Sequence, residues 1–347
     1  MATPAATPPA KMRAVLYDAC GGGSAGLKHV EVPVPSAKKN EVLLKVEAAA
    51  INPLDCKIQK GDLRPLLPRR LPFIPASLFS PAVTDVAGVV VGVGLGVEGL
   101  IVGDQVVAML KSLNGGGLAE YAVASANLTV RRPPEVCAAE GAGLPIAAGT
   151  ALQALRSIGA KFHLDGAGSK PLNVLITAAS GGVGLYAVQL AKLANLHVTA
   201  TCGARNMDLV KGLGADEVMD YRTPEGASLL SPSGAKYDGV VHCTVGVSWS
   251  SFRPLLSDAG GRVIDITPNL WAILRYILHG VTFSKKRLVP LLVSPNKADL
   301  EFLVALLRDG KLKTVIDSRF PLGDAGKAWQ TSIEGHATGK IVVDTQS

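Results

Sequence analysis

A glycine-rich turn at positions 180–184, Ser-Gly-Gly-Val-Gly, stands between two apolar segments and has the residue types of a phosphate-binding loop. Residues 172–177 before it predict a short buried strand, and residues 183–194 predict an apolar helix. Glycines permit a tight turn, close approach of the backbone to a pyrophosphate, and close helix–strand contact. The amides that open the helix favour anions, although many glycine-rich turns are only structural. The pattern therefore predicts a dinucleotide site made by Ser180, Gly181, Gly182, Val183 and Gly184.

The residues after the second predicted strand, 196–201, bear on the choice between NAD and NADP. NAD-binding folds place a carboxylate about twenty positions beyond the glycine turn. Here position 201 is Thr, and no carboxylate occurs before Asp208. The planar guanidinium of Arg205 suits a 2′-phosphate, and it equally suits the start of a surface helix. We therefore predict NADPH as cofactor, bound in part by Thr201, Cys202 and Arg205.

Further polar side chains follow other predicted strands of the same sheet. Thr244 follows residues 237–243 and Thr267 follows residues 261–266, at the carboxyl edge where such sheets bind ligands. Tyr221 follows the third strand, where its ring either flanks the adenine or ribose or only packs. We expect these three side chains to line the cofactor site.

The histidines and cysteines give no sign of a metal site. Neither a His pair at zinc-ligand spacing nor a Cys-x-x-Cys pair occurs among the 6 His and 5 Cys residues. His242 and Cys243 are adjacent, but neighbouring strand residues point to opposite faces and cannot readily share an ion. The cysteines are odd in number and far apart, so we expect reduced thiols and no metal.

Bulk composition bounds the function further. A chain of 347 residues favours two domains. The net charge of +7 comes from scattered basic residues without interleaved aromatics, so we expect no nucleic-acid partner. The apolar run 86–97 is too short to span a bilayer. Residues 1–11 lack the apolar core of a secretory signal, and we expect a disordered tail.

The predicted secondary structure changes along the chain. Residues 12–135 read as short strands separated by Gly, Pro and Asn, and residues 136–310 alternate strand and helix. Such alternation predicts a doubly wound parallel sheet. Residues 311–347 return to strand, helix and strand, and the last strand needs a sheet to join. We therefore predict an α/β protein whose first, β-rich lobe is completed by its C-terminus.

These features together resemble the medium-chain dehydrogenase/reductase superfamily, with a GroES-like β-rich lobe and a Rossmann domain. The motifs Ile-Asn-Pro-Leu-Asp at 51–55, Thr-Asp-Val-Ala-Gly at 84–88, Ala-Gly-Thr-Ala at 148–151 and the turn at 178–184 resemble its zinc-free quinone oxidoreductase branch. Loops at 203–226, 284–292 and 335–343 are similar to the quinone oxidoreductases of the plant chloroplast envelope.

The resemblance implies roles for single residues. Where zinc alcohol dehydrogenases carry their metal ligands, this chain has Asn52, Thr84 and Asp85, which implies metal-free chemistry. It implies NADPH-dependent hydride transfer to an α,β-unsaturated carbonyl or a quinone, with Thr150 near the nicotinamide. Asn52 is our candidate donor to the substrate oxygen, or else a turn residue before a proline. We expect Asp55 to fix that loop, with proton transfer as the alternative.

Other implications leave alternatives open. Family members occur at the chloroplast inner envelope as peripheral proteins, so we expect that location, with the cytoplasm as the alternative. The apolar segment 270–278 either lines the substrate cleft or is an interface helix, because these enzymes are commonly homodimers. Residues 77–83 look inserted near the cleft, so an NADPH-binding protein with weak or lost activity is the alternative function.

Overall fold

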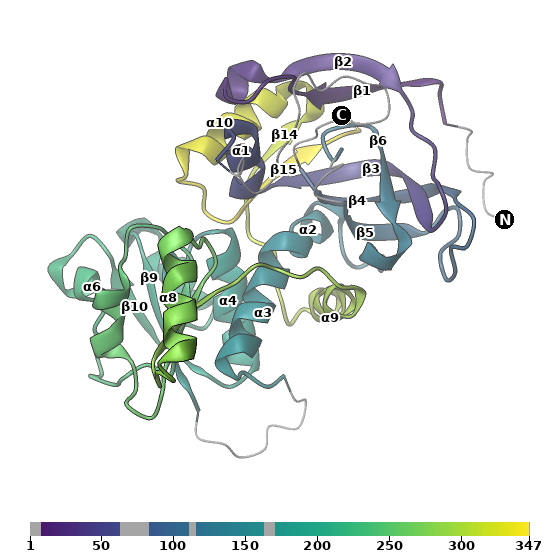
Figure 1. Ribbon diagram of the computed structural model, residues 1–347. Helices are drawn as coiled ribbons and strands as arrows, with labels where there is room; N and C mark the ends of the chain where they lie inside the picture. Colours follow the sequence, from purple (N-terminus) through teal and green to yellow (C-terminus); the bar gives the residue numbers. More distant parts are fainter. Residues whose placement is uncertain (1–7, 63–82, 111–115, 163–170, 347) are drawn as a thin grey trace. The chain divides into compact units, whose positions relative to one another are not determined.

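The computed structural model describes residues 8–62, 83–110, 116–162 and 171–346, and it divides the chain into two compact units (Figure 1). Unit 1 is Met1–Ile146 with Pro295–Ser347, and unit 2 is Ala147–Ser294. Among the helices described, none is both long enough and apolar enough to cross a membrane. Most of the predicted tail, and nearly all of the apparent insertion at 77–83, lie outside the described residues.

Unit 1 is built on a sheet with the strand order β14-β15-β3-β4-β5-β7, and β6 also pairs with β3. β15 runs parallel to β14 and antiparallel to β3, so the C-terminal segment joins the N-terminal sheet, as predicted. A separate antiparallel pair is formed by β1 and β2. The strands are β1 (Lys11–Leu16), β2 (Lys28–Pro33), β3 (Glu41–Ile51), β4 (Asp85–Val93), β5 (Gln105–Met109), β6 (Tyr121–Ser125), β7 (Thr129–Arg131), β14 (Ile316–Pro321) and β15 (Lys340–Asp344).

The core of unit 1 lies on the apolar faces of these strands. Val42, Leu44 and Val46 alternate along β3, which puts all three side chains on one face of the sheet, and each is at most 1% exposed. Trp329 is fully buried, and its indole N–H donates to Oε1 of Gln59 at 2.9 Å, which ties α10 to α1. The helices of the unit are α1 (Pro53–Lys60), α2 (Ala138–Ala142), α9 (Lys297–Arg308) and α10 (Ala325–Glu334).

Unit 2 contains a six-stranded parallel sheet in the order β10-β9-β8-β11-β12-β13. This confirms the predicted doubly wound arrangement, with the order reversing beside β8. Because all strands are parallel, their carboxyl ends meet at one edge of the sheet. The strands are β8 (Asn173–Ile176), β9 (His197–Cys202), β10 (Glu217–Asp220), β11 (Gly239–His242), β12 (Arg262–Asp265) and β13 (Arg287–Pro290).

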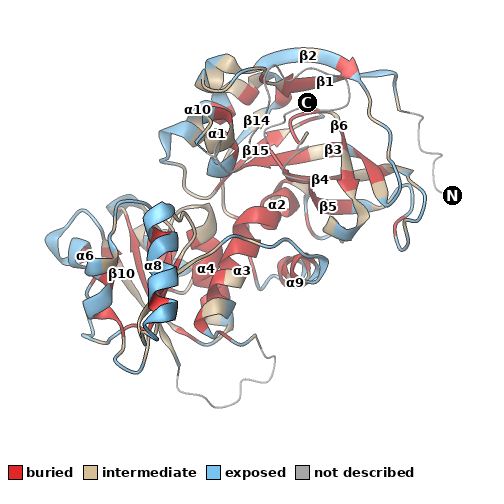
Figure 2. Cartoon of the chain, in the orientation of Figure 1, coloured by how far each residue is buried: buried red, intermediate tan, exposed pale blue. Residues whose placement is uncertain are grey.

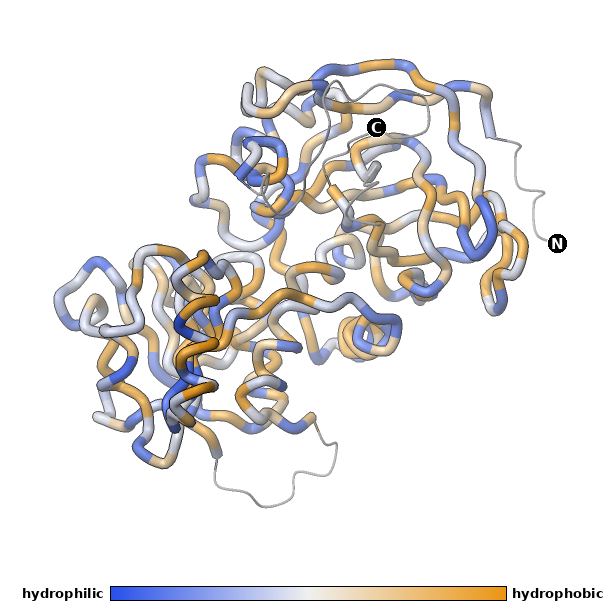
Figure 3. The backbone as a smooth tube through the Cα atoms, in the orientation of Figure 1, coloured by the Kyte–Doolittle hydropathy of each residue, from blue (hydrophilic) through white to orange (hydrophobic). Residues whose placement is uncertain are grey.

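The helices of unit 2 differ sharply in burial. Most of α4 is buried, as its largely apolar sequence requires, whereas α8 keeps most of its surface exposed (Figure 2). Figure 3 shows α8 as one of the most apolar helices of the unit. The helices are α3 (Gly149–Ile158), α4 (Gly182–Leu193), α5 (Met207–Gly212), α6 (Pro224–Ser228), α7 (Trp249–Phe252) and α8 (Leu270–Val281).

The unit boundaries differ from those expected at 135/136 and 310/311. The structure places them at 146/147 and 294/295. The reason is that α2 packs on β3 and β4, and α9 packs on β7, so both helices belong to the core of unit 1. The sequences of α2 and α9 are helical, like those of unit 2, so composition alone wrongly assigns both helices to unit 2.

Candidate functional site

The glycine turn has the geometry that a dinucleotide loop needs. Gly181 caps the N-terminus of α4, and its carbonyl accepts the N–H of Leu185 at 3.0 Å. A Cβ at Gly184 would lie 2.4 Å from the carbonyl oxygen of Ala178 and 2.6 Å from Cα of Ala179. Only glycine therefore lets α4 pack this closely on the turn. The amides of the first turn of α4 are left to bind an anion.

The turn is joined directly to the end of the second strand of the sheet. The N–H of Ala179 donates to the carbonyl of Thr201 at 2.8 Å, which places β9's last residues beside the loop. The side chains of Thr201 and Cys202 are 3% and 1% exposed. Burial raises the pKa of Cys202 to about 11, so its thiol stays protonated at neutral pH. Both predicted residues thus lie beside the loop with their side chains buried, and their part in cofactor binding stays a prediction.

A buried polar link between β8 and β11 was missed from the sequence as a site feature. Oγ1 of Thr177 lies 3.1 Å from Nδ1 of His242 and accepts the N–H of Cys243 at 3.0 Å. Burial lowers the pKa of His242, so the ring is neutral at physiological pH. The link fixes the carboxyl ends of the two central strands. The sequence feature that could have indicated this link is a Thr at the end of a strand, immediately before the glycine turn.

The two threonines predicted at the next strand ends are brought together. Oγ1 of Thr267 donates to the carbonyl of Thr244 at 3.1 Å, and the N–H of Thr267 donates to Oδ1 of Asp265 at 2.9 Å. The first bond joins the loops after β11 and β12, and the second holds Thr267 beside the end of its own strand. Thr150 lies in the first turn of α3 and is 7% exposed.

Arg205 and Tyr221 lie where β9 and β10 end. Arg205 is exposed in a short 3-10 turn, Ala204–Asn206, directly after β9. The ring of Tyr221 is 48% exposed and lies close to Gly203, 3.7 Å from where a Cβ would stand. The guanidinium of Arg222 lies over the same ring, 5.5 Å from its centre. An exposed aromatic ring beside a guanidinium suits an adenosine that carries a 2′-phosphate.

In unit 1, Asn52 lies at the centre of a buried polar network. Its Oδ1 accepts a 2.6 Å hydrogen bond from Nζ of Lys340, and its Nδ2 donates to Oδ2 of Asp85 at 3.0 Å. Nδ2 also lies 3.3 Å from the carbonyl oxygen of Ala50. Asn52, Asp85 and Lys340 are each at most 3% exposed. The network joins the end of β3, the start of β4 and the start of β15.

Asp55 fixes the loop that carries Asn52. Its carboxylate accepts the N–H of Asn52 at 2.8 Å and the N–H of Val83 at 3.0 Å. Val83 has φ 77°, a left-handed conformation that is costly for a β-branched residue, and this bond helps to hold it. These contacts favour the loop-fixing interpretation of Asp55 over proton transfer.

Burial shifts the pKa values of the ionisable groups in this network. It raises the pKa of Asp55 to about 7, with the neighbouring Asp85 adding to the effect and the two backbone N–H donors opposing it. Burial also raises the pKa of Asp85, against the attraction of Lys340, and lowers the pKa of Lys340. The amine of Lys340 therefore shares this described network with two carboxyl groups, and burial disfavours the charged form of all three.

The donor set does not fit a zinc ion. Zinc sites in proteins use thiolate, imidazole and carboxylate ligands, and here the corresponding positions hold an amide, a hydroxyl and one carboxylate. Thr84 donates to Asp85 at 3.3 Å, and Asp85 also accepts from Asn52 and from the N–H of Ile146. The ammonium of Lys340 already supplies the positive charge. Within the described residues, no group of three His, Cys, Asp or Glu side chains is placed to hold a metal.

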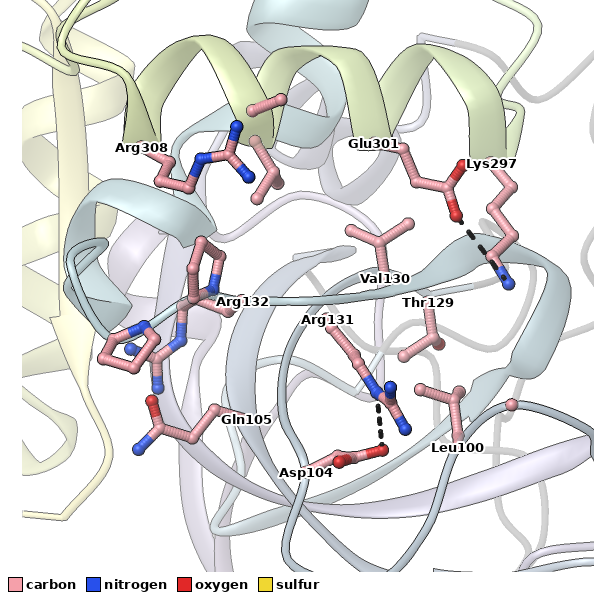
Figure 4. A pocket seen from close by; sticks show the side chains of 15 residues that line it. Leu100, Asp104, Gln105, Thr129, Val130, Arg131, Arg132, Lys297, Glu301 and Arg308 are labelled. Atoms are coloured by element: carbon pink, nitrogen blue, oxygen red, sulfur yellow. Dashed lines mark hydrogen bonds and ion pairs between the residues drawn. The ribbon is translucent and has the colours of Figure 1, made fainter.

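A hollow of about 610 Å³ in unit 1 lies between α9 and the β5–β7 edge (Figure 4). Its basic side chains are already paired. Arg131 bonds Asp104 at 3.1 Å, Lys297 lies 3.9 Å from Glu301, and Arg308 bonds Asp309 at 2.8 Å. Arg132 pairs with Glu47. With its cations neutralised, this hollow does not compete with the glycine turn as an anion site.

The chain shares these features with known proteins. Residues 38–134 match the alcohol dehydrogenase GroES-like domain family, and residues 213–343 match the zinc-binding dehydrogenase family. It is 61% identical, over 96% of its length and 98% of the relative's, to the chloroplast envelope quinone oxidoreductase homolog of Arabidopsis thaliana. The chain belongs to the medium-chain dehydrogenase/reductase superfamily. It is therefore an oxidoreductase with a nicotinamide cofactor.

Other members of the superfamily are similar over the same span. The NADPH-dependent alkenal/one oxidoreductase of Arabidopsis thaliana is 34% identical over 96% of this chain and 80% of its own length. The solved structure of the quinone oxidoreductase from Coxiella burnetii has a TM-score of 0.84 at 29% identity, covering 97% of this chain and 100% of that one. The predicted resemblance and fold are thereby confirmed.

Proposed function

We propose that this chain reduces the activated double bond of α,β-unsaturated carbonyls, or quinones, with hydride from NADPH and without a metal. The observation that carries the cofactor choice is the end of β9, where Thr201 and Arg205 stand in place of a carboxylate. The names of the relatives, which include quinone and alkenal/one oxidoreductases, support the substrate class.

The residues of unit 2 fit NADPH by their donor chemistry. The amides at the start of α4 would bind the pyrophosphate, and Arg205 with Tyr221 would hold the 2′-phosphate and the adenosine. The strand-end links through Thr177 and Thr267 keep the edge rigid. The bound nicotinamide supplies the hydride, and the protein supplies position and polarity.

In the proposed reaction, negative charge grows on the substrate oxygen as hydride arrives at the β-carbon. A donor aimed at that oxygen lowers the barrier. Asn52 remains our candidate. The weaker of its two Nδ2 contacts, the 3.3 Å one to the carbonyl of Ala50, is the one that a substrate oxygen would replace. The stronger contacts, to Asp85 and Lys340, would hold the amide in place during that exchange.

NADPH oxidation tests the proposal. The purified chain is assayed with a panel of quinones and long-chain enones, with NADH in parallel and after dialysis against EDTA. We expect turnover that prefers NADPH and is unchanged by EDTA. Equal rates with NADH contradict the role of Arg205, and loss of activity with EDTA contradicts metal-free chemistry. Tight NADPH binding without oxidation across the panel favours the binding-protein alternative.

For location, we propose the chloroplast inner envelope, with peripheral attachment. Support comes from the names of the relatives, which place the Arabidopsis thaliana homolog at the chloroplast envelope and the Spinacia oleracea homolog in the chloroplast. Fractionation of chloroplasts tests this. We expect the protein in the inner-envelope fraction and its release by a salt or carbonate wash; recovery in the cytosol contradicts it.

A further inference from the structure

Three polar side chains form a row across the carboxyl edge of the unit 2 sheet. His242, the last residue of β11, pairs in register with Asp265, the last residue of β12. On the other side, Thr177 directly follows β8, one position beyond the pairing of Ile176 with Val241. Residues in register on neighbouring parallel strands point to the same face of a sheet. We call Thr177, His242 and Asp265 the strand-end row.

His242 is the centre of the row, and its neighbours fix its orientation. Its Nδ1 lies 3.1 Å from Oγ1 of Thr177. Its ring packs edge-on against Phe252 of α7, with 4.9 Å between the ring centres. Burial lowers the pKa of His242, and the attraction of Asp265 opposes this effect. Because the side chain is only 4% exposed, these contacts rather than water orient the imidazole.

A loop begins directly after each member of the strand-end row. The glycine turn follows Thr177, whose Oγ1 also accepts the N–H of Cys243 in the loop after β11. Oδ1 of Asp265 accepts the N–H of Thr267 at 2.9 Å, and Oγ1 of Thr267 donates to the carbonyl of Thr244 at 3.1 Å. The row therefore connects three loops at the edge where such a sheet binds its ligand.

The row lies on the side of the sheet where the nicotinamide half of a dinucleotide is expected. A doubly wound sheet binds one mononucleotide half on each side of the point where the strand order reverses, here between β8 and β11. Arg205 and Tyr221, which we assign to the adenosine half, follow β9 and β10 on one side. His242 and Asp265 end β11 and β12 on the other side. The half of the cofactor that carries the hydride therefore belongs beside the row.

A role in packing alone does not require an imidazole at position 242. Burial of a polar ring costs free energy unless the ring is hydrogen-bonded. A leucine would pack against Phe252 without that cost. What the imidazole adds is directed contact with Thr177 and Asp265, the residues from which two of the loops begin. Such contacts are needed where loops must keep one arrangement for a ligand.

We propose that His242 is a positioning residue for the nicotinamide half of NADPH. Through Thr177 and Asp265 it holds the glycine turn and the loops after β11 and β12 in the arrangement that brings the nicotinamide to the substrate. Hydride transfer requires close approach of the donor and acceptor carbons, so a small shift of these loops lowers the rate. The inference rests on the proposed function, because it assigns a role within the same cofactor site.

Binding of whole and partial cofactors tests which half the row serves. His242→Leu removes the directed contacts to Thr177 and Asp265. We expect the Kd for NADPH and that for NADH to rise by the same factor, about tenfold, because both cofactors contain the nicotinamide half. The Kd for 2′,5′-ADP, which carries only the adenosine half with its 2′-phosphate, should stay unchanged. At saturating NADPH, we expect kcat to fall by about tenfold or more.

A matched control separates positioning from stability. His279 is also buried in unit 2, and its Nδ1 accepts the N–H of Leu288 at 3.2 Å, but it lies near the end of α8 and not at a strand end. His279→Leu should lose unfolding free energy as His242→Leu does, yet keep kcat and all three Kd values.

Two further variants keep the test independent of the folding of His242→Leu. His242→Asn retains an amide that can bond Oγ1 of Thr177 near the place of Nδ1, and it should recover most of the lost affinity and rate. Thr177→Val removes the hydroxyl from the other end of the same bond. It should give the same difference between NADPH and 2′,5′-ADP as His242→Leu.

Two results would overturn the assignment. If His242→Leu is destabilised like His279→Leu but keeps its kcat and Kd values, His242 has only a structural role. If 2′,5′-ADP binding is lost together with NADPH binding in variants whose circular dichroism is unchanged, the row does not serve the nicotinamide half. Absence of NADPH oxidation by the wild type would instead contradict the proposed function, and the three Kd values would still decide the role of His242.

Discussion

The ammonium group of Lys340 donates a 2.6 Å hydrogen bond to Oδ1 of Asn52, although 288 positions separate the two residues. On the other side of the same amide, Nδ2 donates to Asp85. An ammonium can only donate and an ionised carboxylate can only accept, so these two neighbours permit one orientation of the amide. These bonds thus determine that the Nδ2 edge of Asn52 faces the start of β4 and its Oδ1 edge faces the start of β15.

Removal of the Lys340 ammonium is expected to destabilise unit 1 strongly. In Lys340→Met, Asp85 keeps its buried position without a cation, and Oδ1 of Asn52 loses its donor. We expect the free energy of unfolding in urea to fall by about 3–5 kcal/mol. The control is Lys327→Met, which breaks an exposed ion pair with Asp324 and should cost about 1 kcal/mol or less. Similar losses in both variants would contradict the role of Lys340.

The raised pKa of Asp55 predicts that the stability of the protein depends on pH. Its pKa is raised from 3.8 to about 7 on folding, so the folded state holds a proton that the unfolded state has released. The contribution of Asp55 to the free energy of unfolding is fully present below pH 4 and is lost as the pH rises towards 7. Asp55→Asn cannot titrate. We therefore expect the difference in unfolding free energy, wild type minus variant, to decrease between pH 4 and pH 7; a pH-independent difference would refute this.

The glycine turn tolerates no side chain at position 184. Gly184→Ala places a methyl group 2.4 Å from the carbonyl oxygen of Ala178, so the turn must shift. We expect the affinity for NADPH, measured by fluorescence titration, to drop by about tenfold or more. A tenfold drop corresponds to a loss of about 1.4 kcal/mol in binding free energy. The control is Gly212→Ala at the end of α5, where no heavy atom lies within 4 Å. It should leave affinity unchanged, and an equal drop there would contradict the argument.

Arg205 is expected to discriminate between the two nicotinamide cofactors. In Arg205→Ala, a charged hydrogen bond to the 2′-phosphate is lost, which is worth about 1.5–3 kcal/mol, or roughly 10- to 100-fold in affinity. We expect the KM for NADPH to rise accordingly and that for NADH to change little. Lys285→Ala removes one charge elsewhere on unit 2 and serves as control. A parallel rise for both cofactors would argue against a 2′-phosphate contact.

The sequence allowed the glycine turn and the parallel sheet to be predicted because their signals are local. Strand, turn and helix follow one another within residues 172–194, and the spacing of the glycines is itself the feature. α9 was assigned to the wrong unit, although Asn296 caps it and Leu300, Leu303 and Leu307 mark its buried face. An amphipathic pattern shows which face of a helix is buried but not which sheet that face packs on.

Lys340 could not be found in this way. Lysine is usually exposed, and a single Lys at the start of a strand gives no sign of burial. It is buried because β15 lies between β14 and β3, a pairing between distant parts of the chain. For the same reason the bonds of Asn52 were not foreseen, and its role as a donor to substrate stays a prediction.

The insertion of β15 between β14 and β3 also imposes an order on biosynthesis. Unit 2 consists of one unbroken segment, residues 147–294, and can fold as soon as that segment has been made. The sheet of unit 1 cannot close until residues 340–344 are released, long after β3 has appeared. We therefore expect the sheet beside the loop that carries Asn52 to be completed only after all of unit 2 has been synthesised.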